Sequence, residues 1–197
     1  MRRRRAMMLL AMLPAACSSP NPTLYTLAVL PGTPRPGAPR SIELRAIALA
    51  RYLERSQIVR SSEDFRLDVL SNEWWGEPLD AMISRVLVQE LSERLPGSTV
   101  FSENSAIATP ADVTLGINVQ RLDADRSGTV IMIGQIAISG RNEATRSVRL
   151  SVPPPIAGTS GLVSAMSTAT AQLADAAADM LAVLPAPAAS RGRAQTR

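Results

Sequence analysis

Two apolar alternations on either side of a turn sequence constrain the fold of this chain more than any other feature. Between residues 113 and 120 every second residue is apolar, and residues 130–139 are again rich in Val, Ile and Met. The segment 124–128 between them contains Asp, Ser and Gly, which favour turns. Alternation of this kind is typical of a strand with one buried face, so the sequence predicts a long antiparallel hairpin.

Two other segments have apolar residues spaced three and four apart, as in amphipathic helices. Residues 78–95 start at Pro78, which is tolerated in a first helical turn, and stop before a Pro-Gly pair. Residues 160–184 follow three prolines, have Ser160 as the expected N-cap, and carry a small, Ala-rich face. We therefore expect two main helices, at about 78–95 and 160–184.

Further short segments predict additional strands, one of which, residues 42–49, has apolar residues on both faces and is expected in the centre of the sheet. These segments are residues 25–29, 42–49, 65–70, 100–101 and 144–152. Residues 51–60 show no clear period and are interpreted as an irregular connector. Together with the hairpin and the two helices, the strands predict a single α+β domain with a mostly antiparallel sheet.

The N-terminal segment has the order of a lipoprotein signal. Four arginines precede a short apolar run, and two alanines lead to Cys17, the only cysteine of the chain. The run is far shorter than the ~20 residues that cross a bilayer as a helix, so residues 1–16 are interpreted as a removed signal peptide. We expect a thioether-linked lipid on Cys17. The alternative is an ordinary secretory signal that leaves Cys17 as a free thiol.

The remainder of the chain divides into three parts. Residues 17–24 are polar and contain prolines, and they are expected to be a tether. Residues 25–184 contain all the predicted strands and helices and are expected to form one domain. Residues 185–197 are rich in Pro, Ala and Arg and are expected to be a disordered tail.

The charge of the mature chain is balanced. The sequence has a formal net charge of +4, and the four arginines of the expected signal account for all of it. A nucleic-acid-binding protein needs a clustered basic face, and the sequence has none. We therefore exclude nucleic acid as a partner.

The chain contains no His and no Lys. A Ser-His-Asp triad, a His-based zinc site, a Schiff-base lysine and a Walker A loop each require one of these residues. Arg does not replace them as a base, because it stays protonated at physiological pH. The nearest pair of carboxylates, Asp123 and Asp125, is interpreted as part of the hairpin turn, and a carboxylate hydrolase is a remote alternative. We expect no enzymatic activity, cofactor or metal.

Three further motifs carry a family resemblance. The first is the run 47–60, the second is Trp74-Trp75-Gly76-Glu77-Pro78, and the third is Leu-Ser-Glu-Arg-Leu-Pro-Gly at 91–97. With the early Cys-Ser-Ser-Pro and Tyr-Thr-Leu segments, they closely resemble the PqiC-like lipoproteins, also called ABC-type transport auxiliary lipoproteins. The match is specific over residues 41–101.

The resemblance implies a non-enzymatic lipoprotein subunit of an MCE-type intermembrane lipid transport system. Its implied partners are a periplasmic MCE-domain protein and an inner-membrane ABC transporter or permease. It would be anchored in the outer membrane through acylated Cys17, face the periplasm, and dock the MCE conduit there. Ser18 after the cysteine fits this location, as it does in the lipoproteins that the chain resembles. Assembly of several copies is left open. The alternative is a periplasm-facing carrier that binds lipid itself, which requires an apolar cavity.

Besides Cys17 as the lipid attachment site, four motif residues are expected to contact a partner. They are Tyr52, Arg55, Trp74 and Trp75. The side chains of adjacent strand residues point to opposite faces, so one tryptophan is expected in the core and the other at the surface, with core packing of both as the alternative. Arg55 could instead pair with Glu77 within the fold.

Overall fold

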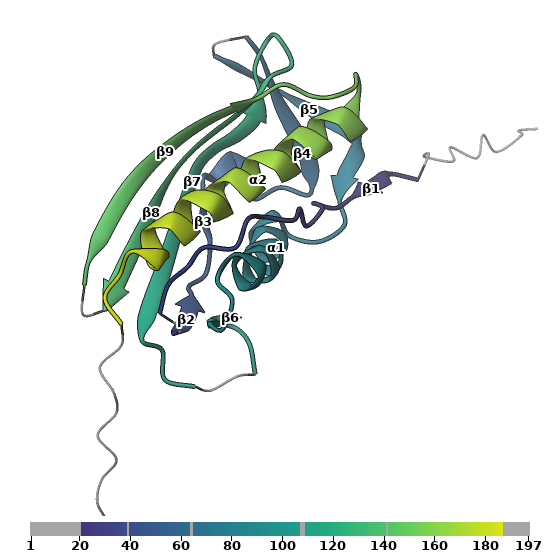
Figure 1. Ribbon diagram of the computed structural model, residues 1–197. Helices are drawn as coiled ribbons and strands as arrows, with labels where there is room; N and C mark the ends of the chain where they lie inside the picture. Colours follow the sequence, from purple (N-terminus) through teal and green to yellow (C-terminus); the bar gives the residue numbers. More distant parts are fainter. Residues whose placement is uncertain (1–20, 39, 64, 107–108, 141, 187–197) are drawn as a thin grey trace, which may run out of the picture.

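The computed structural model describes residues 21–38, 40–63, 65–106, 109–140 and 142–186. The expected signal peptide, Cys17 and nearly all of the expected tail lie outside these ranges. The described residues form one α+β domain in which two helices lie on the same side of a long curved sheet (Figure 1). The α+β class with two main helices is thus confirmed.

The curved sheet contains the predicted hairpin. Its strand order is β6-β2-β7-β8-β9, and a further short strand, β3, also pairs with β7. The strands β7, β8 and β9 pair antiparallel, whereas β2, β3 and β6 pair parallel with their neighbours. The bounds are β2 Ser41–Leu44, β3 Ala48–Leu49, β6 Thr99–Ser102, β7 Val113–Ala124, β8 Val130–Gly140 and β9 Ala144–Val152.

The turn between β7 and β8 is held by one carboxylate. Asp125 accepts hydrogen bonds from the backbone N–H groups of Ser127 (2.8 Å) and Thr129 (3.1 Å) and from the Ser127 hydroxyl (2.6 Å). These bonds lower the pKa of Asp125, those from Ser127 most. Asp123, by contrast, lies in β7, so its assignment to the turn was wrong.

A small second sheet has the order β1-β5-β4. Its strands are β1 Thr23–Tyr25, β4 Gln57–Glu63 and β5 Arg66–Trp75. The prediction of an irregular connector at 51–60 was therefore wrong: a 3₁₀ helix at Arg51–Leu53 leads directly into β4. The two apolar residues Ile58 and Val59 are both buried, so this strand lacks the alternation that reveals a half-exposed strand in a sequence.

The two helices are close to their predicted positions. They are α1 Leu79–Arg94 and α2 Thr159–Ala182. Gly158, with a φ of 89° that favours glycine, occupies the N-cap position of α2, so the prediction of Ser160 as the cap was wrong. Helix α2 packs on β7, β8 and β9, and α1 packs on α2 and β6. Neither helix, nor any other within the described ranges, is long and apolar enough to cross a membrane.

Residues 26–38 form an extended segment, here called the strap, that runs along both helices (Figure 1). The sequence predicted a strand up to residue 29, but β1 ends at Tyr25 because the strap amides next find acceptors on helix side chains instead of on a neighbouring strand. These bonds run from Leu27 to Met82 Sδ (3.1 Å), Ala28 to Ser167 Oγ (3.0 Å) and Leu30 to Glu90 Oε1 (2.8 Å).

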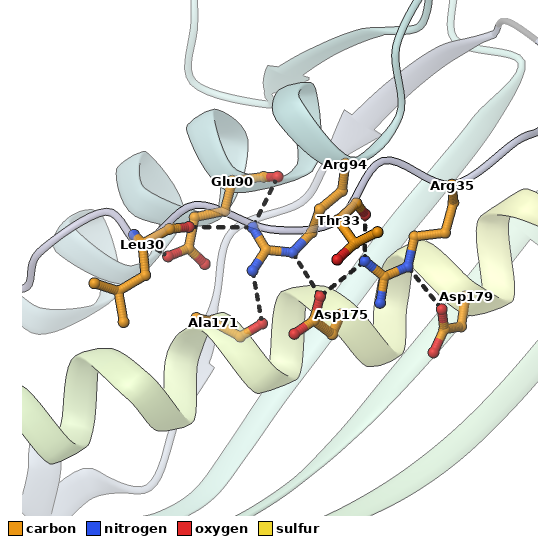
Figure 2. A network of polar contacts seen from close by, with 8 residues as sticks. All are labelled: Leu30, Thr33, Arg35, Glu90, Arg94, Ala171, Asp175 and Asp179. Atoms are coloured by element: carbon orange, nitrogen blue, oxygen red, sulfur yellow. Dashed lines mark hydrogen bonds and ion pairs between the residues drawn. The ribbon is translucent and has the colours of Figure 1, made fainter.

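The guanidinium of Arg94 joins the strap to both helices (Figure 2). It is 1 % exposed, and its Nε donates to Asp175 Oδ1 on α2 at 2.9 Å. The other nitrogens donate to the carbonyl oxygens of Glu90 (3.1 Å), Leu30 (3.4 Å) and Ala171 (3.4 Å). One buried cation thus binds α1, α2 and the strap together.

Two strap residues, Gly32 and Arg35, allow the strap to pass close to Arg94 and bind there. A Cβ at Gly32 would overlap the Arg94 guanidinium, so only glycine lets the strap pass at this distance. Arg35 donates its backbone N–H to the Arg94 carbonyl oxygen (2.7 Å), and its side chain pairs with Asp175 (3.0 Å) and Asp179 (2.8 Å) on α2 (Figure 2).

Glu90 makes the stability of this junction depend on pH. Its side chain is buried, and its Oε2 has no hydrogen-bond partner among the described residues. Burial raises the pKa of Glu90, although the Leu30 amide and Arg94 oppose the shift. Because the folded state binds this proton more tightly than the unfolded state does, the stabilisation is complete below the ordinary pKa of 4.5 and is lost as the pH rises through the folded value.

We predict that Glu90→Gln removes this pH dependence. The free energies of unfolding of variant and parent are measured in urea at a series of pH values. As the pH rises from about 4.5 to neutrality, the value of the variant minus that of the parent should increase, because only the parent loses the stabilisation by the Glu90 proton. Glu93→Gln, on an exposed position of the same helix, controls for the loss of one charge. A difference between variant and parent that stays constant over this range would contradict the account.

Candidate functional site

The register of the small sheet decides which motif residues share a face. Leu24 of β1 and Gln57 of β4 both pair with Trp74, Val59 pairs with Val69, and Ser61 pairs with Leu67. Paired residues, and residues two apart along a strand, lie on the same face. We call the face of β1 and β5 that carries Leu24, Leu67, Val69 and Trp74 the outer face. Trp74 and Val69 are five residues apart on β5, but their partners Gln57 and Val59 are only two apart on β4. The register shift between these two pairs therefore keeps Trp74 on the same face as Val69 and Leu67.

The two tryptophans lie on opposite faces of the small sheet. Trp75 is 7 % exposed and belongs to the hydrophobic core. Trp74 is only partly buried, and its indole N–H donates to the carbonyl oxygen of Ser71 at 2.9 Å. The structure therefore places one tryptophan in the core and leaves the other accessible on the outer face.

Tyr52 lies elsewhere and has a structural contact. Its hydroxyl donates to Asp123 Oδ2 at 2.6 Å and accepts the Leu122 amide at 3.4 Å. Burial, and then Asp123, raise the pKa of Tyr52, so the hydroxyl remains a donor at neutral pH. Ser61 Oγ (3.0 Å) and Arg121 Nη2 (2.9 Å) bind the other oxygen of the same carboxylate.

Asp123 is therefore a buried junction that the sequence interpretation missed. It is 2 % exposed and connects the 3₁₀ helix and β4 to the end of β7. The one signal in the sequence was a carboxylate inside an apolar strand pattern. Arg121 Nε also donates to Oδ1, at 3.1 Å, so both oxygens have partners and Asp123 is not an exposed acid or base.

Arg55 and Glu77 do not pair. Arg55 is exposed in the bend before β4, whereas Glu77 Oε1 accepts from Arg85 Nη2 at 2.6 Å. The expected alternative of an Arg55–Glu77 ion pair was wrong. Arg85 also donates to Thr26 Oγ1 at 3.2 Å, which links α1 to the first residue of the strap.

Cys17, the expected lipid attachment site, lies outside the described residues.

The outer face carries three exposed large apolar side chains, and a fourth lies in the turn beside it. Leu24 is 63 % exposed, Leu67 45 % and Val69 43 %, and Phe65, in the turn between β4 and β5, is 90 % exposed. These are four of the six large apolar side chains that are exposed among the described residues. Contiguous exposed apolar area of this kind marks an interaction surface. The sequence did not indicate it, because the partners of a strand decide which of its faces is covered.

A cleft of about 680 Å³ opens between the β7–β8 turn, β4 and the loop that precedes α2. Leu70 and Leu162 contribute apolar wall, whereas Arg60, Asp125 and Arg126 contribute charged groups. Within the described ranges, no group of three or more His, Cys, Asp or Glu side chains is arranged to hold a metal ion.

The two tryptophans give a direct test of the register. We predict that Trp75→Ala lowers the free energy of unfolding by about 3–5 kcal/mol, because it leaves a cavity in the core. Trp74→Ala, the matched control one residue away, should lower it by about 1 kcal/mol or less, because this side chain is only partly buried and lies outside the core. Urea denaturation measures both. Equal losses, or a larger loss at Trp74, would show that the faces are assigned incorrectly.

Known solved structures share this fold. A crystal structure of an uncharacterized protein matches with a TM-score of 0.70 and 22 % identity, covering 82 % of this chain and 99 % of the other. Protein XCC0632 from Xanthomonas campestris matches with a TM-score of 0.68 and 18 % identity, covering 81 % of this chain and 94 % of the other. At these identities the likeness concerns the fold alone.

Proteins of similar sequence identify the family of this chain. The intermembrane transport lipoproteins PqiC of Escherichia coli (strain K12) and Shigella flexneri are each 29 % identical to this chain over 126 residues. The alignment covers 61 % of this chain and 66 % of each relative, slightly less than two thirds of their length. A family model described as the ABC-type transport auxiliary lipoprotein component matches residues 25–178. The chain belongs to this family of ABC-type transport auxiliary lipoproteins, whose members are PqiC-like transport components rather than enzymes.

Proposed function

We propose that this chain is the lipid-anchored subunit of an MCE-type intermembrane lipid transport system and docks the periplasmic MCE conduit to the outer membrane. The observation that carries the proposal is the family match over residues 25–178. The relatives that are named intermembrane transport lipoproteins support it. The partners in this proposal are an MCE-domain protein and an inner-membrane ABC transporter or permease.

The position of the first strand suits an anchored protein. Cys17 precedes Thr23, the first residue of β1, by six residues. An extended chain spans at most about 3.6 Å per residue, so β1 would lie within about 22 Å of the anchored sulfur. The strap then ties this end of the chain to both helices. The tether is thus short, and the domain it holds is firmly connected to it.

The side chains support a role in binding and positioning. The sequence has no His or Lys to act as a base or nucleophile. The carboxylates that came closest to a catalytic arrangement, Asp123 and Asp125, are occupied by hydrogen bonds within the fold. A subunit of this kind makes and breaks no covalent bond.

The alternative is a carrier that binds lipid in its own cavity. The cleft beside the β7–β8 turn has the volume for part of a lipid, but it opens to the surface and has Arg60, Asp125 and Arg126 in its wall. A carrier instead encloses acyl chains in apolar surface. The cleft therefore supports the docking role better than the carrier role.

The anchor and the partner can be tested in one experiment. We predict that the parent protein, expressed with its transport operon, incorporates labelled fatty acid, fractionates with the outer membrane and co-purifies with an MCE-domain protein. Cys17→Ser should lose the label and the membrane retention, because the thioether cannot form, whereas Ser19→Ala should keep both.

Unchanged membrane retention of Cys17→Ser would contradict the anchor. Absence of an MCE-domain protein from the purified parent would contradict the docking role. Stoichiometric phospholipid extracted from the purified Cys17→Ser protein would favour the carrier instead.

A further inference from the structure

We propose that the outer face of the small sheet lies on the lipid surface to which Cys17 is attached, with Leu24, Leu67 and Val69 against the acyl-chain boundary and Trp74 at the interface. The sheet would thereby fix the orientation of the domain on the membrane. The inference rests on the acylation of Cys17 that is proposed above.

The short tether keeps the small sheet close to the lipid surface, and the outer face is the apolar one. Leu24 follows Cys17 by seven residues, which span at most about 25 Å when fully extended. Leu24 itself belongs to the outer face and pairs with Trp74. The residues that connect the fold to the lipid thus lead into β1, and Leu24 is the first large exposed apolar side chain among the described residues.

The outer face has the composition of a membrane-contacting surface. Its large side chains on β1 and β5 are Leu24, Leu67, Val69 and Trp74, of which the first three are between 43 % and 63 % exposed. Trp is enriched where the hydrocarbon region of a bilayer meets water, because it combines an apolar ring with one polar group. Among the described residues, the indole N–H of Trp74 donates to the carbonyl oxygen of Ser71.

The charged residues of β5 lie away from this surface. Asp68 and Glu73 alternate with the outer-face residues, and so they project from the opposite face. Asp68 pairs with Arg66 at 3.1 Å, and Glu73 raises the pKa of Tyr25 by accepting its hydrogen bond. Phe65, in the turn at the end of the sheet, is 90 % exposed. Lipid contact therefore requires no desolvation of a carboxylate of β5.

Most of the β4 half of the sheet is already covered, which limits the contact to β1 and β5. Val59 is 5 % exposed, and Ser61 donates to Asp123 on β7 at 3.0 Å. The uncovered strip runs from Leu24 and Trp74 along β5 to Leu67. Trp74 and Leu67 pair with Gln57 and Ser61, which are four residues apart on β4, so at about 3.3 Å per residue this part is about 13 Å long.

The test uses the full acylated chain with a single reporter. Because Cys17 is the only cysteine and is consumed by acylation, a cysteine introduced as Leu67→Cys is the one free thiol for an environment-sensitive fluorophore. The labelled protein is reconstituted in vesicles of phosphatidylethanolamine and phosphatidylglycerol, with and without bromine on the acyl chains. Thr145→Cys, exposed on β9 of the curved sheet, is the matched control.

We expect the fluorophore at position 67 to shift to the blue in vesicles and to lose intensity with brominated lipid, while the fluorophore at position 145 does neither. A blue shift without bromine quenching would mean that a second copy or a protein partner covers the outer face, and it would overturn the inference. An unshifted fluorophore at position 67 would also overturn it.

Mass spectrometry of the same sample separates this inference from the proposed function. A lipidated chain whose position 67 remains in water overturns the membrane contact alone and leaves the anchor intact. A chain without lipid on Cys17 contradicts the anchor, and the inference fails with it.

Discussion

The arrangement of this domain depends on one buried cation, the guanidinium of Arg94. A buried charge is costly unless it is paired and its remaining hydrogen-bond capacity is satisfied. Here Asp175 supplies the counter-charge, and carbonyl oxygens of α1, α2 and the strap accept the other hydrogen bonds. The three segments are far apart in the sequence, so the cation stabilises the packing that local preferences cannot specify.

The strap connects the Arg94 interaction to the end of the domain that lies nearest the proposed anchor. It leads from β1, the end nearest the proposed anchor, across both helices to the curved sheet. Gly32 permits its close passage over Arg94, and Arg35 adds two ion pairs with α2. A force applied at the proposed anchor would thereby be transmitted to the helices and the curved sheet. A domain that positions a partner relative to a membrane needs this kind of rigid connection.

The elements that could be predicted from the sequence are those with a local period. The β7–β8 hairpin and both helices were found because their apolar residues repeat every two or every three to four positions. β4 was missed because Ile58 and Val59 are buried together, and the strap was missed because its acceptors are side chains of distant helices. Arg94 itself looks in the sequence like an ordinary cation in the last turn of a helix, a position that favours positive charge.

In the candidate site, too, features with a local pattern could be predicted and contacts between distant segments could not. The opposite faces of Trp74 and Trp75 followed from strand geometry, whereas Cys17 lies outside the described residues and its acylation stays a prediction. The outer face could not be predicted, because the exposure of Leu67 and Val69 depends on β1, β4 and β7 and on what these strands leave uncovered. Tyr52, expected at an interface, instead binds Asp123 across a sequence distance that no local pattern indicates.

Amide hydrogen exchange in the strap tests the central role of Arg94 most directly. In the parent protein the Leu30 and Arg35 amides, bound to Glu90 and to the Arg94 carbonyl, should be protected, and in Arg94→Met they should exchange rapidly while the β7–β8 hairpin remains protected. Arg85→Met, which removes an exposed ion pair from the same helix, should leave both amides protected. Protection of the two amides that is unchanged in Arg94→Met would contradict the account.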